Sequence, residues 1–154
     1  MSEENQQFAI QKIYLKDVSF ESPNSPQVFT NGDLQPQINV QINSSSQAVA
    51  EDTYEVVLDI TVTAKHEEKT AFLAEVKQAG IFTVAGFEPE NTGGMIGAYC
   101  PEVLFPFARE AVSELVSKGG FSQLLLAPVN FNALYAQQIQ QQQAAAQTEE
   151  SAQH

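Results

Sequence analysis

The chain has few of the residues that enzymes and metal proteins use most often. Its 154 residues include one cysteine, two histidines and no tryptophan. Because Cys100 is the single cysteine, no intrachain disulfide can form. The chain's two histidines, His66 and His154, add too few ligands for a typical zinc site. The sequence has no run of 18 apolar residues, and residues 1–5 lack the basic start and apolar core of a signal peptide. We therefore expect a cytosolic protein that does not insert into a membrane.

Basic residues are also scarce. Lys and Arg number 7 against 19 Asp and Glu, and the formal net charge is -12. Such a charge repels phosphate backbones and anionic lipid head groups, so neither nucleic acid nor a membrane surface is an expected partner. Two interpretations of the acidity stay open: it keeps the protein soluble, or it serves a cationic protein partner.

No catalytic motif is evident. Cys100 has no His or Lys near it in the sequence that would activate a thiol, which is typical of an inert, buried cysteine. The glycine-rich stretch 93–97 lacks the Lys-Ser/Thr pair of a phosphate-binding loop, and the acidic pairs 51–52 and 67–68 fall in predicted turns. We expect a binding protein that is not an enzyme and needs no cofactor or metal. A small enzyme with an unrecognised acid pair and a purely structural oligomer are the alternatives.

Apolar periodicity predicts four strands. They cover residues 8–20, 37–43, 53–65 and 72–84, with Ser44, Ser45 and Ser46 interrupting the second. Glu67-Glu68 is expected to form a hairpin turn, and Gly80 indicates a bulge or bend in the last strand. The long loop 22–36 carries Val28, Phe29 and Leu34, so it either packs on its own core or binds something.

The first of these strands is apolar on both sides. Phe8, Ile10, Tyr14, Val18 and Phe20 fall on its even face, whereas Ile13 and Leu15 fall on its odd face. A strand with one face in water does not show this pattern. We expect a second layer or another subunit to cover it, and hence a homo-oligomer.

Helical spacing follows the strands. One helix is predicted from Pro101 to Lys118, with Pro106 either kinking it or preceding its regular part. Gly119-Gly120 ends this helix, an apolar connector spans 121–129, and Asn130 is expected to cap a second helix. The glycine-rich segment 86–98 is predicted to be a mobile loop.

This order of elements predicts an α+β domain over residues 1–143, with a four-stranded antiparallel sheet and two C-terminal helices. From Ala144 onward no apolar residue is larger than alanine. Such a segment cannot offset its ordering entropy, so residues 144–154 are predicted to be a disordered acidic, Gln- and Ala-rich tail.

Acidic residues gather on one predicted face of the sheet. Asp17, Glu21, Glu55, Asp59 and Glu75 all have odd numbers, and on three strands the odd positions oppose the main apolar row. Leu73 shares that face. This pattern indicates either an ordinary polar outer face or an acidic docking surface with an apolar centre, suited to a basic partner.

Several separate stretches, in order over about residues 8–135, resemble the SecB family of bacterial export chaperones. They are Ile13 to Asn24, Tyr54 to Leu58, Thr70 to Val76, Gly97 to Pro101, Leu104 to Glu110 and Leu126 to Phe131. The resemblance implies the predicted fold, assembled as a cytoplasmic homotetramer, a dimer of dimers. It also implies an ATP-independent chaperone without a metal, which holds precursor proteins unfolded in apolar surface grooves and delivers them to the SecA translocation motor.

The resemblance also suggests site residues. Family contacts for SecA match Asp17, Glu21, Leu73 and Glu75. The loop departs from the family, because Leu34 stands where a Trp is common, and the Gln/Ala-rich tail departs too.

Candidates for the apolar groove that binds unfolded clients are Phe20, Phe29, Leu34 and Tyr135, each of which could instead pack in the core. The alternative function is a general holdase of the same fold that serves another partner, such as a toxin–antitoxin system.

Overall fold

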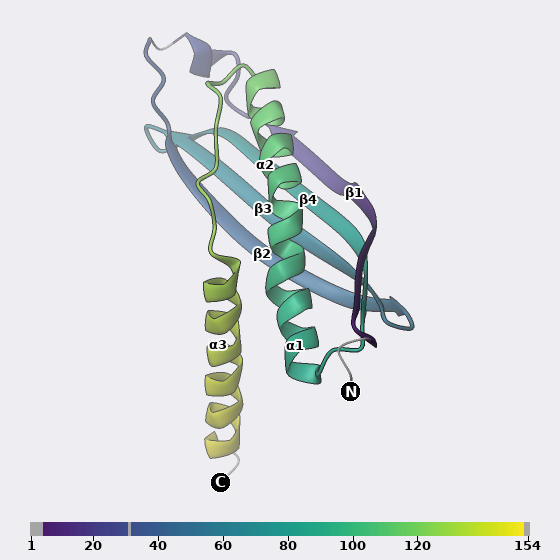
Figure 1. Cartoon of the computed structure of the whole chain (residues 1–154). Helices are drawn as coiled ribbons and strands as arrows, with labels where there is room; N and C mark the ends of the chain where they lie inside the picture. Colours follow the sequence, from purple (N-terminus) through teal and green to yellow (C-terminus); the bar gives the residue numbers. More distant parts are fainter. Residues whose placement is uncertain (1–4, 31, 153–154) are drawn as a thin grey trace.

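A four-stranded antiparallel sheet followed by helices forms the chain (Figure 1). The computed structural model describes residues 5–30 and 32–152, so residues 1–4 and His154 lie outside the described residues. The strands are β1 (Gln7–Glu21), β2 (Gln37–Ala50), β3 (Thr53–His66) and β4 (Lys69–Ala85), in the spatial order β1-β4-β3-β2. The predicted α+β class and the sheet followed by two helices are confirmed.

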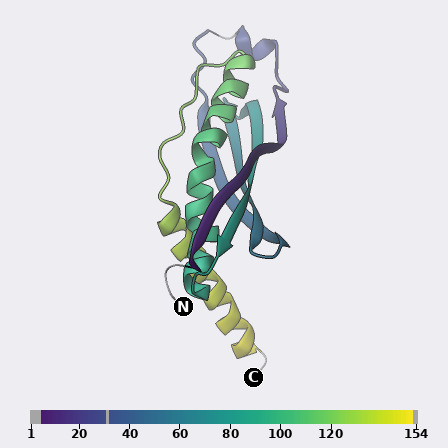
Figure 2. The ribbon, with the colours of Figure 1, turned by 45° about the vertical axis from the view of Figure 1, so that its right-hand side comes forward.

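A long helix crosses one face of this sheet, as Figure 2 shows. It is built from α1 (Pro89–Gly94), the π-helical η3 (Met95–Tyr99) and α2 (Cys100–Lys118), while α3 (Phe131–Ala152) follows after an irregular connector. Even-numbered side chains of β3 and β4, such as Leu58, Ile60 and Phe82, are fully buried on the face beneath α2. We call this the helix-covered face, and the opposite side, which no described element covers, the open face.

The second strand is longer than predicted. It runs through the three serines to Ala50, because Ser44, Ser45 and Ser46 pair with Leu58, Val57 and Val56 of β3. Pairing uses backbone groups, so an unbroken partner strand can hold residues of low strand propensity. The Glu67-Glu68 hairpin is confirmed, with φ of 51° and 69°.

Two bulges in β1 overturn the prediction of a two-sided strand. Its pairing with β4 shifts between Ile10 and Lys12 and again between Leu15 and Asp17. Since each extra residue reverses the alternation of faces, the apolar side chains come to one side. Phe8, Ile10, Ile13, Leu15, Val18 and Phe20 all pair with even residues of β4, on the helix-covered face.

Gly80 does not mark a bulge, because β4 keeps its register there with both neighbours. A Cβ at this position would lie 2.7 Å from the Phe82 ring and 3.1 Å from Leu104. The glycine instead makes room for α2 to approach the sheet closely.

The expected mobile loop at 86–98 is mostly helical, so that prediction was wrong. Pro89 begins α1, and the π turn of η3 leads into Pro101, which lacks a backbone N–H and therefore suits a break in the usual hydrogen-bond pattern. The helix continues through Pro106 to Lys118.

The second helix begins where predicted and extends further. The backbone N–H of Ala133 donates to Oδ1 of Asn130 at 3.0 Å, which is the expected cap. The helix then runs through residues 144–152, which the sequence predicts to be disordered. Glutamine and alanine are good helix formers, although every side chain from Gln140 to Glu149 is exposed.

Candidate functional site

The acidic residues predicted to share one face do share the open face. Glu21 pairs with Leu73, Ser19 with Glu75, and Asp17 with Lys77, while Asp59 pairs with Lys77 from the other side. The four residues matched to SecA contacts therefore lie on two adjacent strands at one end of the sheet. We call Asp17, Glu21, Asp59, Leu73 and Glu75 the acidic surface.

Within the acidic surface, the Asp59 carboxylate has the least favourable electrostatic environment. Burial raises the pKa of its carboxyl, and nearby Glu75 raises it further, which outweighs the attraction of Lys77. Its buried Oδ1 has no hydrogen-bond partner among the described residues, whereas Glu75 accepts a bond from Thr61 at 3.3 Å. The buried Oδ1 of Asp59 is out of reach of a partner, but the exposed acids Asp17 and Glu21 on the same face favour the approach of cationic groups. The half-buried Leu73 adds an apolar contact.

Glu55, on the same face, has a different environment. It is only 7% exposed, and its carboxylate accepts bonds from Lys16 Nζ at 2.8 Å, Gln47 Nε2 at 3.0 Å and the Tyr14 hydroxyl. Lys16 and then Tyr14 hold the pKa of Glu55 below its usual value, and burial with the bond to Glu55 raises the pKa of Tyr14 to about 12. Glu55 is thus a satisfied internal ion rather than a free surface charge.

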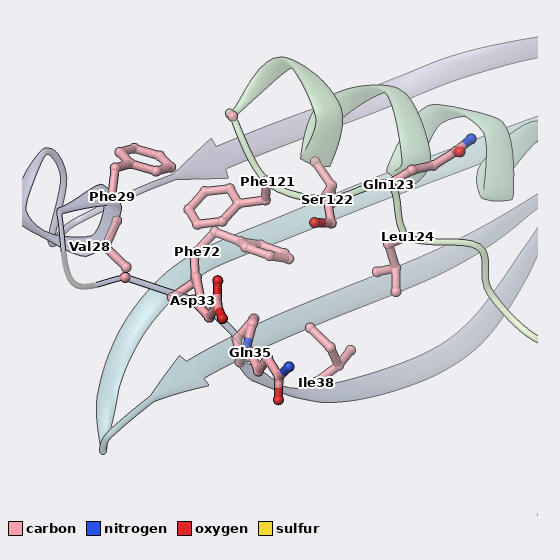
Figure 3. Close-up of a pocket in the computed structure, with 15 residues that line it drawn as sticks. Val28, Phe29, Asp33, Gln35, Ile38, Phe72, Phe121, Ser122, Gln123 and Leu124 are labelled. Carbon is pink, nitrogen blue, oxygen red and sulfur yellow. The ribbon is translucent and has the colours of Figure 1, made fainter.

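An apolar hollow lies on the other side of the molecule, between the loop after β1 and the connector after α2. Its volume is about 530 Å³. We call it the apolar hollow for its aromatic and aliphatic wall of Phe29, Leu34, Ile38, Phe72, Phe121 and Leu124, although Asp33, Gln35, Ser122 and Gln123 give the rest of its lining a polar character. Figure 3 shows the rings of Phe29, Phe72 and Phe121 close together at one end, with Ile38 and Leu124 further along. Ring centroids lie 5.1 Å apart for Phe29–Phe121 and 4.8 Å apart for Phe72–Phe121.

Phe20 of β1 is not among the residues that line this hollow, but it packs against two rings that do. Its ring stacks on Phe72 at 5.8 Å and lies 6.4 Å from Phe121. Phe29 stays 46% exposed, so one ring of the cluster is available to a ligand. The structure therefore brings Phe20, Phe29 and Leu34 to one place.

Tyr135 lies elsewhere. It packs against the glycines of α1 and η3, where a Cβ on Gly97 would come within 2.4 Å of its ring. With Ser44, Ser46 and Gln138 it lines a separate hollow of about 310 Å³. Among the four candidates for client binding, Tyr135 thus stands apart from the aromatic cluster.

Sequence reasoning missed the contribution of the connector. Phe121 and Leu124 line the apolar hollow, and Ile38 completes it from β2. The connector is visibly apolar in sequence, but only the fold brings residues 121–124 beside residues 28–38.

No other chemistry emerges from the part of the chain that the structure describes. It contains no group of three or more His, Cys, Asp or Glu side chains that could hold a metal. Burial raises the pKa of the Cys100 thiol to about 12, so this cysteine is an unreactive core residue. None of the described helices is both long and apolar enough to cross a membrane.

Comparison with known proteins shows which family this chain resembles. The sequence profile of the family described as "Preprotein translocase subunit SecB" matches residues 1–142. The chain is 58% identical to the protein-export protein SecB of Nitrosococcus oceani over 96% of this chain and 92% of that protein. It is 57% identical to the SecB of Methylococcus capsulatus over 96% of this chain and 97% of that protein.

A solved structure shares the fold. The Mycobacterium tuberculosis SecB-like chaperone, in complex with a ChAD peptide from the HigA1 antitoxin, superposes with a TM-score of 0.65. Its sequence identity is 14%, and the match covers 79% of this chain and 90% of that chain.

Proposed function

Because the chain belongs to the SecB family of protein-export chaperones, we propose that it performs its two binding tasks on two separate surfaces. Family membership makes it a cytoplasmic, non-enzymatic chaperone that binds precursor proteins and is linked to SecA. The separation of the acidic surface from the apolar hollow is the observation that carries the proposal. In this assignment SecA docks on the first, and unfolded precursors bind at the second.

The acidic surface suits SecA for electrostatic reasons. On the open face Glu21 lies opposite Leu73, and Glu75 follows Leu73 two residues along β4. Asp17 lies further along the same row. A basic partner therefore gains charge attraction beside an apolar contact. Since much of the attraction involves exposed acids, we expect the affinity to fall as salt rises.

A charge reversal tests the docking surface. Glu75→Lys places a cation among Asp17, Asp59 and Leu73, and we expect it to abolish binding of the SecA C-terminal zinc peptide in isothermal titration calorimetry. Glu51→Lys is the matched control, because this exposed acid lies in the turn at the opposite end of β3. Unchanged affinity for Glu75→Lys would reject the surface and favour a holdase serving another partner.

The apolar hollow suits unfolded chains because it offers aromatic and aliphatic contacts without selecting one sequence. Phe29 and Leu34 line it, Phe121 extends it from the connector, and Phe20 supports the Phe121 ring from β1. Tyr135 belongs to the binding surface in this proposal only through the separate hollow beside α3.

Removing the exposed apolar wall tests client binding. For a folded double variant Phe29→Ser with Leu34→Ser, we expect weaker suppression of the aggregation of a diluted, unfolded precursor without ATP. SecA-peptide binding serves as the internal control, since neither residue lies on the acidic surface. Full holdase activity in that variant would exclude this hollow as the client site.

Two further features belong to the proposal. Ile10, Leu15 and Phe107 are 47%, 51% and 45% exposed, and such apolar side chains support assembly as a homotetramer, a dimer of dimers. The chaperone domain ends at residue 143 in this assignment, since from Ala144 onward no apolar residue is larger than alanine.

A further inference from the structure

Glu55 connects three strands that are not all neighbours. It lies on β3, its partner Gln47 lies on the adjacent β2, and its partners Tyr14 and Lys16 lie on β1, beyond β4. Tyr14 pairs with Ala79 of β4, whose small side chain leaves the tyrosine free to reach across that strand to Glu55.

Lys16 is the extra residue of the second bulge in β1. Leu15 pairs with Gln78 and Asp17 pairs with Lys77, so Lys16 has no partner of its own in β4. The bulge is held from both faces of the sheet. On the helix-covered face, Gln78 Nε2 donates to the backbone oxygen of Tyr14 at 3.0 Å, and on the open face Glu55 binds the Lys16 side chain at 2.8 Å.

This bulge determines which β1 side chains lie on the open face, where SecA is proposed to dock. Before it, Tyr14 lies on the open face, and after it Asp17, Ser19 and Glu21 do so. Without the extra residue the alternation would place Lys16, Val18 and Phe20 there and turn the two acids toward α2. Two of the four proposed docking residues therefore depend on the Lys16 bulge.

We propose that Glu55 is a positioning residue for SecA docking: by binding Lys16 and Tyr14 it holds the β1 bulge that places Asp17 and Glu21 beside Leu73 and Glu75. The inference rests on the proposed docking surface and deepens it. Glu55 itself acts at a distance, because it lies four residues from Asp59 along β3, about 13 Å. Its own carboxylate is nearly buried and its bonds are already made within the chain.

Glu55→Leu tests this role, because leucine is similar in size and can accept neither bond. We expect affinity for the SecA C-terminal zinc peptide to fall about tenfold, the loss that follows if the competent bulge is populated about a tenth of the time. Glu51→Gln, which removes an exposed charge four residues away in the turn before β3, should stay within twofold of the parent. Hydrogen exchange at the amides of residues 17–21 should accelerate in Glu55→Leu while β2 and α2 keep their protection.

Comparison with two other variants makes the result decisive. If Glu75→Lys abolishes binding but folded Glu55→Leu binds within twofold of the parent, the positioning role is wrong and the docking surface stands. If Glu75→Lys binds normally, the docking surface itself is wrong. Should Glu55→Leu fail to fold, Lys16→Met replaces it: a severalfold weaker affinity with faster exchange at residues 17–21 supports the role, and parental affinity overturns it.

Discussion

Glu55 and Asp59 lie on the same strand and face, yet their carboxyl pKa values move in opposite directions. Glu55 is deeply buried but has three donors, so its pKa is lowered. Asp59 is less buried but has an unsatisfied oxygen and the neighbouring charge of Glu75, so its pKa is raised. Bonding to the ionised form, rather than depth of burial, decides the direction at each site.

We therefore expect the ionised Asp59 carboxylate to lower the free energy of unfolding at neutral pH. A folded-state pKa above the unfolded value means that its favourable contribution is complete below the unfolded pKa and is lost as pH rises through the folded pKa. We expect Asp59→Asn to raise the free energy of unfolding at pH 7 by about 0.5 kcal/mol, the usual size of one unfavourable cross-strand contact.

Urea unfolding at pH 7 and pH 3.5 checks this expectation. The gain should shrink at the lower pH, where Asp59 of the parent is largely protonated, and exposed Asp33→Asn should show no comparable gain. The same variant should weaken SecA-peptide binding, because it removes a charge from the acidic surface. A less stable Asp59→Asn protein at pH 7 would contradict the assignment.

At the scale of elements, the even–odd alternation of β3 and β4 made the helix-covered face and the grouping of acids predictable from sequence. The β1 bulges were not predictable, because the extra residues Gln11 and Lys16 are ordinary strand residues and only pairing with β4 reveals them. The helix at 89–99 was missed for a related reason. Its glycines look like loop residues, but Gly93 and Gly97 are the small surface on which Tyr135 packs.

A pair of alanine substitutions tests that packing. Gly97→Ala would place a Cβ 2.4 Å from the Tyr135 ring. We expect this clash to weaken the packing of the N-terminal turns of α3 and to lower the free energy of unfolding by about 1–3 kcal/mol. Gly94→Ala has no heavy atom within 4 Å of the added Cβ, and alanine should stabilise the helix there by up to about 1 kcal/mol. Hydrogen exchange of residues 131–139 should therefore accelerate in the first variant only. Equal behaviour of the two variants would show that Tyr135 does not fix α3.

At the scale of the whole molecule, the two proposed binding surfaces use different parts of the fold. The acidic surface needs only β1, β3 and β4, whereas the apolar hollow needs the loop after β1 and the connector, segments about 90 residues apart in sequence. Resemblance could name Phe29 and Leu34, but it could not place Tyr135 apart from them. That separation depends on where α3 packs, which local sequence does not encode.

Several apolar side chains are exposed to solvent on the side of the molecule formed by β1 and α2. Leu15 and Phe107 line one hollow of about 300 Å³ together with Ile13 and Ala111, and both are about half exposed. A cluster of this kind is typical of a surface that another copy of the chain covers. A second copy packed there would also bury Leu15, which lies on the helix-covered face of β1 and yet stays 51% exposed beside α2.

Analytical ultracentrifugation at micromolar concentration tests this assembly. We expect the parent to sediment as a tetramer and Leu15→Asp, which puts a charge into the proposed contact, to sediment as dimers or monomers. Val49→Asp is the control, because Val49 is 49% exposed but lies at the β2 end of the sheet. A compact parental monomer would reject the tetramer. Tetramers in both variants would place the contact elsewhere on the chain.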